Sequence, residues 1–278
     1  MINYALIMIA IGVFAGFAGA ILGLGGGIIL TPILTLLMGV DIKYAIGASI
    51  VAVIATSSGA TIAYLRDKVL NLRVAMFLEI ATTLGALSGA LLTGVIDPKY
   101  LYILFGLLLL FSGYNMIRKL ISHQEVLHRA HPDNLSAKFR LDSTYFDNVE
   151  GKQIDYQVEH IPGGLAVMYG AGIASGLLGI GSGAFKVIAM DTVMKMPLKP
   201  STSTSNLMMG VTAAASATVY FFNGSIKPMI AVPLALGILV GARGGSRIVR
   251  DMSARSIRMI FVPILFYIGI EMFMKGLR

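Results

Sequence analysis

Gly23-Leu24-Gly25-Gly26-Gly27 interrupts a sequence that is otherwise apolar for more than a hundred residues. A degenerate copy, Gly179-Ile180-Gly181-Ser182-Gly183, lies 156 positions further along. Glycine inside an apolar helix lets the backbone leave helical geometry and approach a ligand closely. Within a bilayer, such irregular backbone is tolerated only where it is buried in protein or lines a cavity. Two breaks at matching positions therefore indicate the binding site of a membrane transporter.

The composition excludes most soluble classes. The 278 residues are 56% hydrophobic and only 13% charged, and the mean hydropathy is +0.80. Globular proteins carry about a quarter charged residues, so this balance is typical of a membrane protein with several spans. The basic residues lie mostly in short loops, which makes nucleic-acid binding a poor interpretation of the net charge of +8. There is no cysteine, which excludes disulfides and zinc-thiolate sites.

The order of apolar segments predicts an all-α fold with a polar insert. In the first half the segments are residues 2–22, 28–40, 44–65, 74–95 and 100–117. The second segment spans about 20 Å as a helix, which is shorter than the roughly 30 Å hydrocarbon core. A broken or re-entrant helix is therefore expected there. Residues 119–160 are polar, and the alternation around Gly151 predicts a β-hairpin in this insert.

The second half repeats the first without a gap. At an offset of 156 the glycines of the two breaks align, as do Thr56 with Thr212 and Tyr64 with Tyr220. We therefore predict two membrane repeats, residues 1–118 and 161–278, with about five hydrophobic segments each. Because five is odd, the repeats enter the membrane in opposite senses and form an inverted repeat.

Lysine and arginine in the loops predict the orientation. One side collects the insert and Arg66, Lys68, Arg73, Lys195, Lys199, Arg250, Arg255 and Arg258. The other side has little beyond Lys43, Lys99, Lys227, Lys275 and Arg278. By the positive-inside rule the insert is cytoplasmic and both termini lie outside.

The glycine breaks are the first candidates for ligand contact. A helix that begins inside the membrane presents unpaired backbone N–H groups and the positive end of its dipole, which favour an anion. The backbone of Gly25, Gly26, Gly27, Gly181, Ser182 and Gly183 is placed to do this. The alternative is that these glycines only permit close helix crossing. A nucleotide-binding loop does not fit, because the spacing of a P-loop and a soluble βαβ unit are both missing.

Polar residues after the breaks extend the candidate site. Lys186 lies three residues past the second break, in an apolar segment where a charge is costly. We therefore expect its ammonium to meet an anionic ligand or an acidic partner. The alternative is that the side chain extends to the membrane interface. Hydroxyls and an amide could donate to an oxyanion or only bond the backbone. The residues concerned are Ser49, Thr56, Ser57, Ser203, Ser205 and Asn206.

Glu79 is the acid that lies well inside a span of the first half. It is a candidate proton site or the partner of a basic residue such as Arg243, which replaces a leucine of the first repeat. The four histidines, His123, His128, His131 and His160, lie in or at the end of the insert without a metal-ligand spacing. We predict no metal, no cofactor and no enzymatic activity.

The two glycine motifs, Pro32, the serine and threonine run and the inverted repeat resemble the sulfite exporter TauE/SafE family. The resemblance covers both membrane halves and leaves the insert outside. The second motif departs from the pattern at Ser182 and has Ile188 in place of a proline. The resemblance implies transport of sulfite, sulfonates or sulfoacetate across a prokaryotic plasma membrane.

These patterns predict a secondary transporter, an exporter of a small oxyanion, that works by alternating access with one half rocking against the other. The resemblance implies that the oxyanion contains sulfur. Lys186 would supply charge, and the drive would be a proton or sodium gradient or the substrate gradient itself. An anion channel lined by the same residues is the first alternative. A membrane sensor with the insert as its output module is the second.

Overall fold

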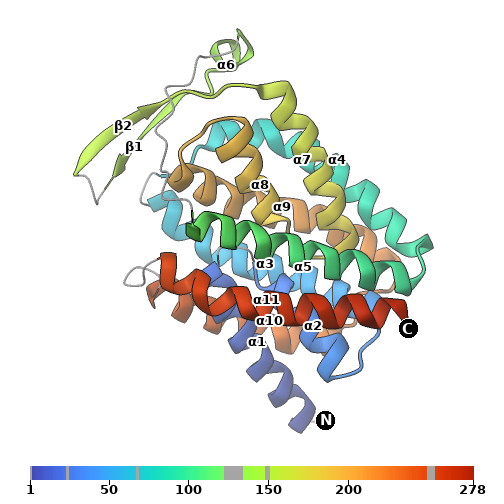
Figure 1. Ribbon diagram of the computed structural model, residues 1–278. Coiled ribbons are helices and arrows are strands. Elements are labelled where there is room, and N and C mark those ends of the chain that lie inside the picture. Colours follow the sequence, from blue (N-terminus) through green and yellow to red (C-terminus); the bar gives the residue numbers. More distant parts are fainter. Residues whose placement is uncertain (1, 23–24, 67–68, 122–133, 148–150, 249–253) are drawn as a thin grey trace.

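The computed structural model describes every residue except 1, 23–24, 67–68, 122–133, 148–150 and 249–253. Part of the first glycine motif and three histidines of the insert, His123, His128 and His131, therefore lie outside the described residues. The chain is an all-α membrane protein with one small hairpin (Figure 1). Among the described helices, four are long and apolar enough to cross a membrane, with spans Ile42–Gly59, Leu72–Val95, Ile161–Leu178 and Pro228–Gly245.

Two series of helices flank the insert. Before it come α1 (Ile2–Leu22), α2 (Gly27–Pro32) with the π-helical turn η1 (Ile33–Leu37), α3 (Ile42–Arg66), α4 (Leu72–Val95) and α5 (Pro98–Ile121). After it come α7 (Ile161–Leu178), α8 (Gly183–Ile188) with η2 (Ala189–Val193), α9 (Leu198–Phe222), α10 (Pro228–Ile248) and α11 (Ala254–Leu277). The bounds of α2, η1, α3 and α5 recur 156 positions later in α8, η2, α9 and α11.

The short second segment has the length that the sequence predicts. Helix α2 and η1 together cover residues 27–37, and α8 and η2 cover residues 183–193. A π-helical turn follows both Pro32 and Ile188. Proline is therefore not what widens the helix at this point, and such turns are frequent at functional sites.

The long helices pack in pairs that cross between the two series. Helix α1 lies against α10, α4 against α7, α5 against α11 and α3 against α9. Glycines allow the closest crossings: a Cβ added at Gly16 would lie 2.5 Å from the Ile238 carbonyl oxygen, and one at Gly172 would overlap the carbonyl oxygen of Thr82. Close approach of backbones through small residues is the usual way in which membrane helices associate.

The insert forms a hairpin and docks on one end of the bundle. It contains α6 (Asn134–Phe139), β1 (Ser143–Asp147) and β2 (Lys152–Tyr156), and the two strands pair antiparallel where the sequence predicts a hairpin. The side-chain amide of Asn71, before α4, donates to the Leu141 carbonyl and to the Tyr156 hydroxyl, both at 3.0 Å. Its backbone N–H donates to Thr204 Oγ1 of α9 at 3.1 Å. The hairpin and α6 thus lie at the end that holds the α3–α4 turn (Figure 1).

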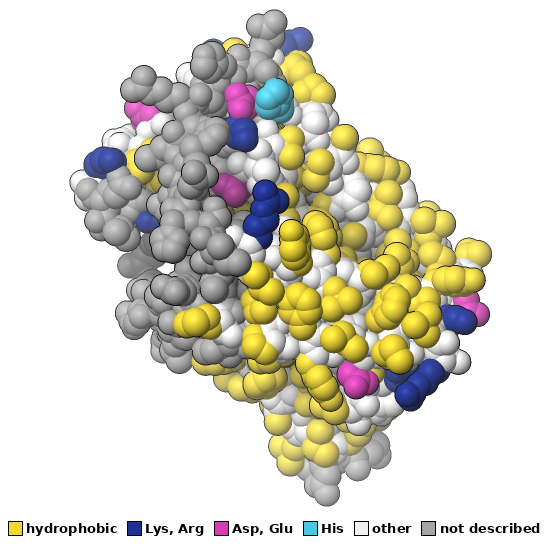
Figure 2. All heavy atoms as spheres, viewed as in Figure 1, with side chains coloured by type: hydrophobic (Ala, Val, Ile, Leu, Met, Phe, Trp, Pro, Cys, Tyr) yellow, Lys and Arg dark blue, Asp and Glu magenta, His cyan; other side chains and the backbone are white. Residues whose placement is uncertain are grey.

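Charged side chains avoid the middle of the bundle surface. On the face drawn in Figure 2, hydrophobic side chains cover the central part and most lysines and arginines gather towards the two ends. Large apolar side chains such as Leu91, Val95 and Val240 are more than half exposed. This is the surface expected of helices that face lipid.

Candidate functional site

The two glycine breaks meet in the centre of the molecule. A Cβ added at Gly27 would lie 2.6 Å from the Gly179 carbonyl oxygen and 2.5 Å from Ser49 Oγ. Ser49 on α3 donates to that same carbonyl at 2.8 Å. Gly25 faces Met209 of α9 and the Ile180 carbonyl. The structure therefore brings both breaks together, with α3 and α9 beside them.

The chain passes through these breaks in a left-handed backbone conformation. Gly25, Gly179 and Gly181 have φ of +77°, +66° and +74°, values that glycine adopts at little cost. Ser182 has φ +49° and is the N-cap of α8 without making a side-chain cap bond. A non-glycine residue in this conformation is under strain, and such residues cluster at ligand sites.

Most of the predicted polar ligands already donate to backbone carbonyls. Ser205 Oγ bonds Gly183 O at 3.1 Å, and Ser57 Oγ bonds Asn206 O. Thr56, Ser203 and the Asn206 amide each bond the carbonyl four residues earlier in their own helices. Ser205 thus holds the second break against α9, while the others bond α3 or α9, so these hydroxyl hydrogens are already used in this conformation.

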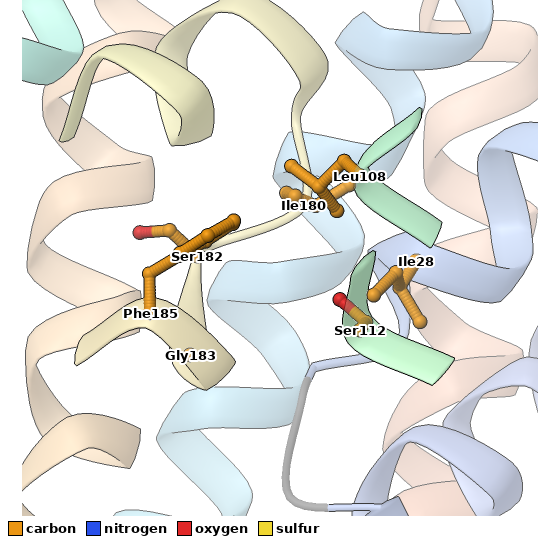
Figure 3. A pocket seen from close by; sticks show the side chains of 7 residues that line it. All are labelled: Ile28, Leu108, Ser112, Ile180, Ser182, Gly183 and Phe185. Carbon is orange, nitrogen blue, oxygen red and sulfur yellow. The ribbon is translucent and has the colours of Figure 1, made fainter. Parts of the chain in front are cut away.

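Two buried serine hydroxyls differ from these. Ser112 on α5 and Ser182 have no hydrogen-bond partner among the described residues. Both line a small pocket between the second glycine break, α2 and α5 (Figure 3). The other lining residues are Ile28, Leu108, Ile180, Gly183 and Phe185. The pocket has a volume of about 10 Å³, which is room for one water-sized group, so it must widen to take a larger ligand that accepts hydrogen bonds from these hydroxyls.

Ser112 was missed in the sequence. It lies in an apolar helix, and its match in the second repeat is Ile268, so neither composition nor the repeat distinguishes it. Ser112 becomes a candidate only because α5 packs beside the second break. The neighbouring Phe111 of α5 stacks on Phe185 of α8, with 5.7 Å between the ring centroids.

A buried charged network lies on α4, α8 and α9. Lys186 has no exposed surface, and its Nζ donates to Thr212 Oγ1 at 2.5 Å. Thr212 Oγ1 lies 2.7 Å from Glu79 Oε1, to which Thr83 also donates at 3.1 Å. Glu79 Oε2 is buried without a hydrogen-bond partner among the described residues. The ammonium and the carboxylate attract each other, and Thr212 bridges them.

The structure thus gives Glu79 different surroundings from those that the sequence suggested. Arg243, named as its charge partner, is exposed on α10, a helix that packs against α1 and α3. The acidic partner that was expected for Lys186 is Glu79, which lies on α4 and is far from Lys186 in sequence. Thr212 was noted only as the repeat match of Thr56, and the bridge that it makes is visible only in three dimensions.

No three histidine, aspartate or glutamate side chains gather as a metal site in the part of the chain that the structure describes. The pocket offers hydroxyl donors and the first turn of α8. These groups can bind a polar ligand by hydrogen bonds, and the pocket lining includes no acid, base or thiol that would attack one.

The chain is similar in sequence to a known family and to several bacterial and archaeal proteins. The sequence profile of the family described as sulfite exporter TauE/SafE matches residues 8–272. The probable membrane transporter protein YunE of Bacillus subtilis is 26% identical over 278 residues, which cover 98% of each chain. A probable membrane transporter protein of Xylella fastidiosa strain Temecula1 is 27% identical, with 96% of this chain and 95% of its own covered. The probable membrane transporter protein MJ0441 of Methanocaldococcus jannaschii is 24% identical, with 96% and 94% covered. No solved structure matches the chain.

Proposed function

Since the chain belongs to the sulfite exporter TauE/SafE family of membrane transporters, we propose that it exports a small sulfur-containing oxyanion such as sulfite, a sulfonate or sulfoacetate. The observation that carries this proposal is the pocket beside the second glycine break. Ser112 and Ser182 supply two buried hydroxyls there that have no other described partner. Oxyanions accept hydrogen bonds from such donors, and the apolar wall strengthens each of these bonds.

The glycine breaks supply further donors. The backbone of Gly181, Ser182 and Gly183 turns into α8 beside the pocket, and Gly25, Gly26 and Gly27 turn into α2 from the other series. The first N–H groups of a helix have no partner inside the helix, and a helix start favours negative charge, so in this proposal they donate to the anion. Lys186, one turn into α8, adds a positive charge behind the pocket.

The two series of helices form an inverted repeat in this proposal. The recurrence of helix bounds at an offset of 156 and the odd number of segments in each series support it. The paired crossings support it too, because α1 with α10 and α7 with α4 are equivalent under the same offset. The insert is placed in the cytoplasm and both termini outside, on the distribution of lysine and arginine.

Transport proceeds by alternating access, with moving units that cross the repeats. The closest packing joins α1 to α10 and α4 to α7 through glycine-lined crossings, so neither repeat can separate from the other as a body. In this proposal one unit contains α1 and α10 with α3, which packs on α10, and the other contains α4 and α7 with α9, which packs on α4. The contact between them is the α3–α9 interface, where both breaks lie.

Flux measurements test the proposal. Purified protein in liposomes is expected to carry sulfite or methanesulfonate with saturating kinetics, and an unlabelled second anion on the opposite side should accelerate exchange. Chloride on the opposite side, at the same concentration, is the control for a general anion leak. Currents that rise without saturation would instead identify a channel. Protein lacking residues 124–159 should still transport, and loss of flux with an unchanged melting temperature would favour the sensor.

A further inference from the structure

Glu79 and Thr212, which bind Lys186 in a buried network, have no part in holding the anion as described above. This network lies on the side of α8 that faces α9, whereas Phe185 and Ser182 line the pocket. It is nevertheless mechanically connected to the pocket, because the Lys186 backbone N–H donates to the Ser182 carbonyl at 3.1 Å. Burying an acid and a base together is costly, and such residues inside a membrane protein mark ion or substrate pathways.

We propose that Glu79, Thr212 and Lys186 form the proton-binding element of this transporter, in which protonation of Glu79 frees the charge of Lys186 to hold an anion in the Ser112–Ser182 pocket. This inference rests on the proposed function, since it names the ion that is coupled to the anion. One proton binds to the Glu79 carboxylate, and Lys186 stays an ammonium throughout.

The hydroxyl of Thr212 provides a switch between the two states. Its oxygen accepts from Lys186, and its single hydrogen has two acceptors at 2.7 Å, Glu79 Oε1 and the Met208 carbonyl. An ionised carboxylate is the stronger acceptor and takes this hydrogen. When Glu79 is protonated, the Thr212 hydrogen turns to the Met208 carbonyl, and the negative charge that attracts Lys186 is gone.

Charge balance then sets the stoichiometry. The empty site holds one negative and one positive charge and is neutral. A proton alone leaves a net charge of +1, and a monovalent anion alone leaves −1, both of which are costly inside the membrane. A proton and an anion together restore neutrality. The carrier therefore reorients either empty or with both, moves them in the same direction, and runs outward when the anion is concentrated inside.

Other charged groups lie away from Glu79. Arg73, two turns earlier on α4, donates to the Arg140 carbonyl of the insert. Lys199 lies in the first turn of α9, about 20 Å along the helix from Thr212. The hydroxyl of Tyr169 on α7 lies near Ser88, which is more than two turns after Glu79 on α4. Other titratable groups on the elements packed around α4 include His160, Asp191 and Tyr220, and Tyr145 and Tyr156 of the insert pack near the start of α4. Among the described residues, Lys186 is the one whose charge acts on Glu79.

The decisive experiment follows protons and anion together. Methanesulfonate is the probe because it stays a monovalent anion at every pH used. In weakly buffered liposomes with a pH dye inside, an inward methanesulfonate gradient should acidify the lumen by one proton per anion, and a potential set with valinomycin should not change the rate. Anion flux without proton movement, or flux that follows the potential, would overturn the inference and leave the proposed transport intact.

Variants assign the effect to the network. Glu79→Gln should abolish proton movement and net methanesulfonate flux but keep the exchange of internal for external anion, because exchange needs no proton release. Glu271→Gln, at an exposed acid of α11, is the matched control and should keep coupling. Thr212→Val should reduce coupling at least tenfold. Equal loss of exchange and coupling in Glu79→Gln would mean a structural role and would overturn the inference.

Two further measurements test the inference if Glu79→Gln does not fold or if methanesulfonate is not carried. The double variant Glu79→Gln with Lys186→Met removes both buried charges, so it should fold even if Glu79→Gln does not, and it should move no protons. Infrared difference spectra of the purified protein should contain the carbonyl stretch of a protonated carboxylic acid that grows as the pH falls and is missing in Glu79→Gln. A missing band in the wild type would overturn the proton site whatever anion is carried.

Discussion

Ser182 combines two properties that few residues of this chain share. Its backbone has a left-handed conformation at φ +49°, and its buried hydroxyl has no partner among the described residues. The other predicted hydroxyls, such as those of Ser49 and Ser205, donate to carbonyls of the glycine breaks. At the scale of residues, the site therefore divides into hydroxyls that fix the backbone and hydroxyls that are available to a ligand.

Ser112→Ala tests this division. If Ser112 donates to the anion, its loss should cost about 1.5–3 kcal/mol of binding, which is roughly a tenfold to hundredfold rise in Kd. Anion binding by the purified protein, measured by calorimetry, gives the comparison. Ser58→Ala is the control, because Ser58 is an exposed serine that bonds the Ile54 carbonyl of its own helix. Equal affinities in Ser112→Ala and the wild type would remove this residue from the site.

Tyr156 predicts a pH dependence in the insert, outside the spans. Burial raises the pKa of its hydroxyl to about 12, against an ordinary value of about 10. The folded state thus favours the neutral phenol, and the stability from this group is fully present below pH about 10 and is lost as the pH rises through about 12. A difference titration of tyrosinate absorbance between wild type and Tyr156→Phe should place this group near pH 12.

The sequence indicates which single residues are unusual, but it does not indicate which side chains they contact. The cost of a charge in an apolar segment was enough to single out Lys186 and Glu79 as unusual. Their bridge through Thr212 depends on how α4, α8 and α9 pack, and spacing along the chain carries no information about that. Ser112 gave no signal at all, because a serine in an apolar helix is ordinary. The roles of these residues as ligands stay predictions.

At the scale of elements, the two short helices and their π-helical turns define the centre. Helices α2 and α8 each begin at a glycine break and run for only six residues before the helix widens. The sequence predicted their position and shortness from the glycines and the length of the apolar segment. It could not predict that the two breaks touch, because this depends on how tightly α3 and α9 approach each other.

Gly27→Ala should disrupt this contact. The added Cβ would lie 2.5 Å from Ser49 Oγ and 2.6 Å from the Gly179 carbonyl oxygen, and the backbone of the second break cannot move away without breaking its bond to Ser49. Overpacking of this kind costs about 1–3 kcal/mol or more, so the melting temperature in detergent should fall clearly. In Gly59→Ala the new Cβ would meet nothing within 4 Å on α3, and the melting temperature should stay equal or rise slightly. Equal effects of the two substitutions would contradict the close contact between the breaks.

At the scale of the whole molecule, the important feature is that helix pairs cross between the two series. Helix α1 is bound to α10 and α7 to α4 by glycine-lined faces, while α3 and α9 meet in the middle. The sequence predicted the repeat from its register and a rocking of one half against the other. The packing favours different moving units, each with helices from both series, and only tertiary contacts could reveal this.

Cross-linking distinguishes the two arrangements, and the chain suits it because it contains no cysteine. A Cβ added at Gly245 would lie 3.2 Å from the Cβ of Ala20. A Cβ added at Gly210 would lie 3.1 Å from the Cβ of Ser57. Both Cβ pairs lie close to the 3.5–4.5 Å of a disulfide, but a Cβ at Gly245 would also lie 2.5 Å from the Phe17 carbonyl oxygen, so the α1–α10 crossing must open to accept it. The flux of the reduced double variant is therefore the reference for each link. Oxidation of Ala20→Cys with Gly245→Cys joins α1 to α10 within one proposed unit, so anion flux should stay within about twofold of the reduced protein. Oxidation of Ser57→Cys with Gly210→Cys joins α3 to α9 across the proposed interface and should stop flux, which a reducing agent should restore. If both links stop flux, the units are the repeats themselves, because each link joins a helix of the first repeat to a helix of the second.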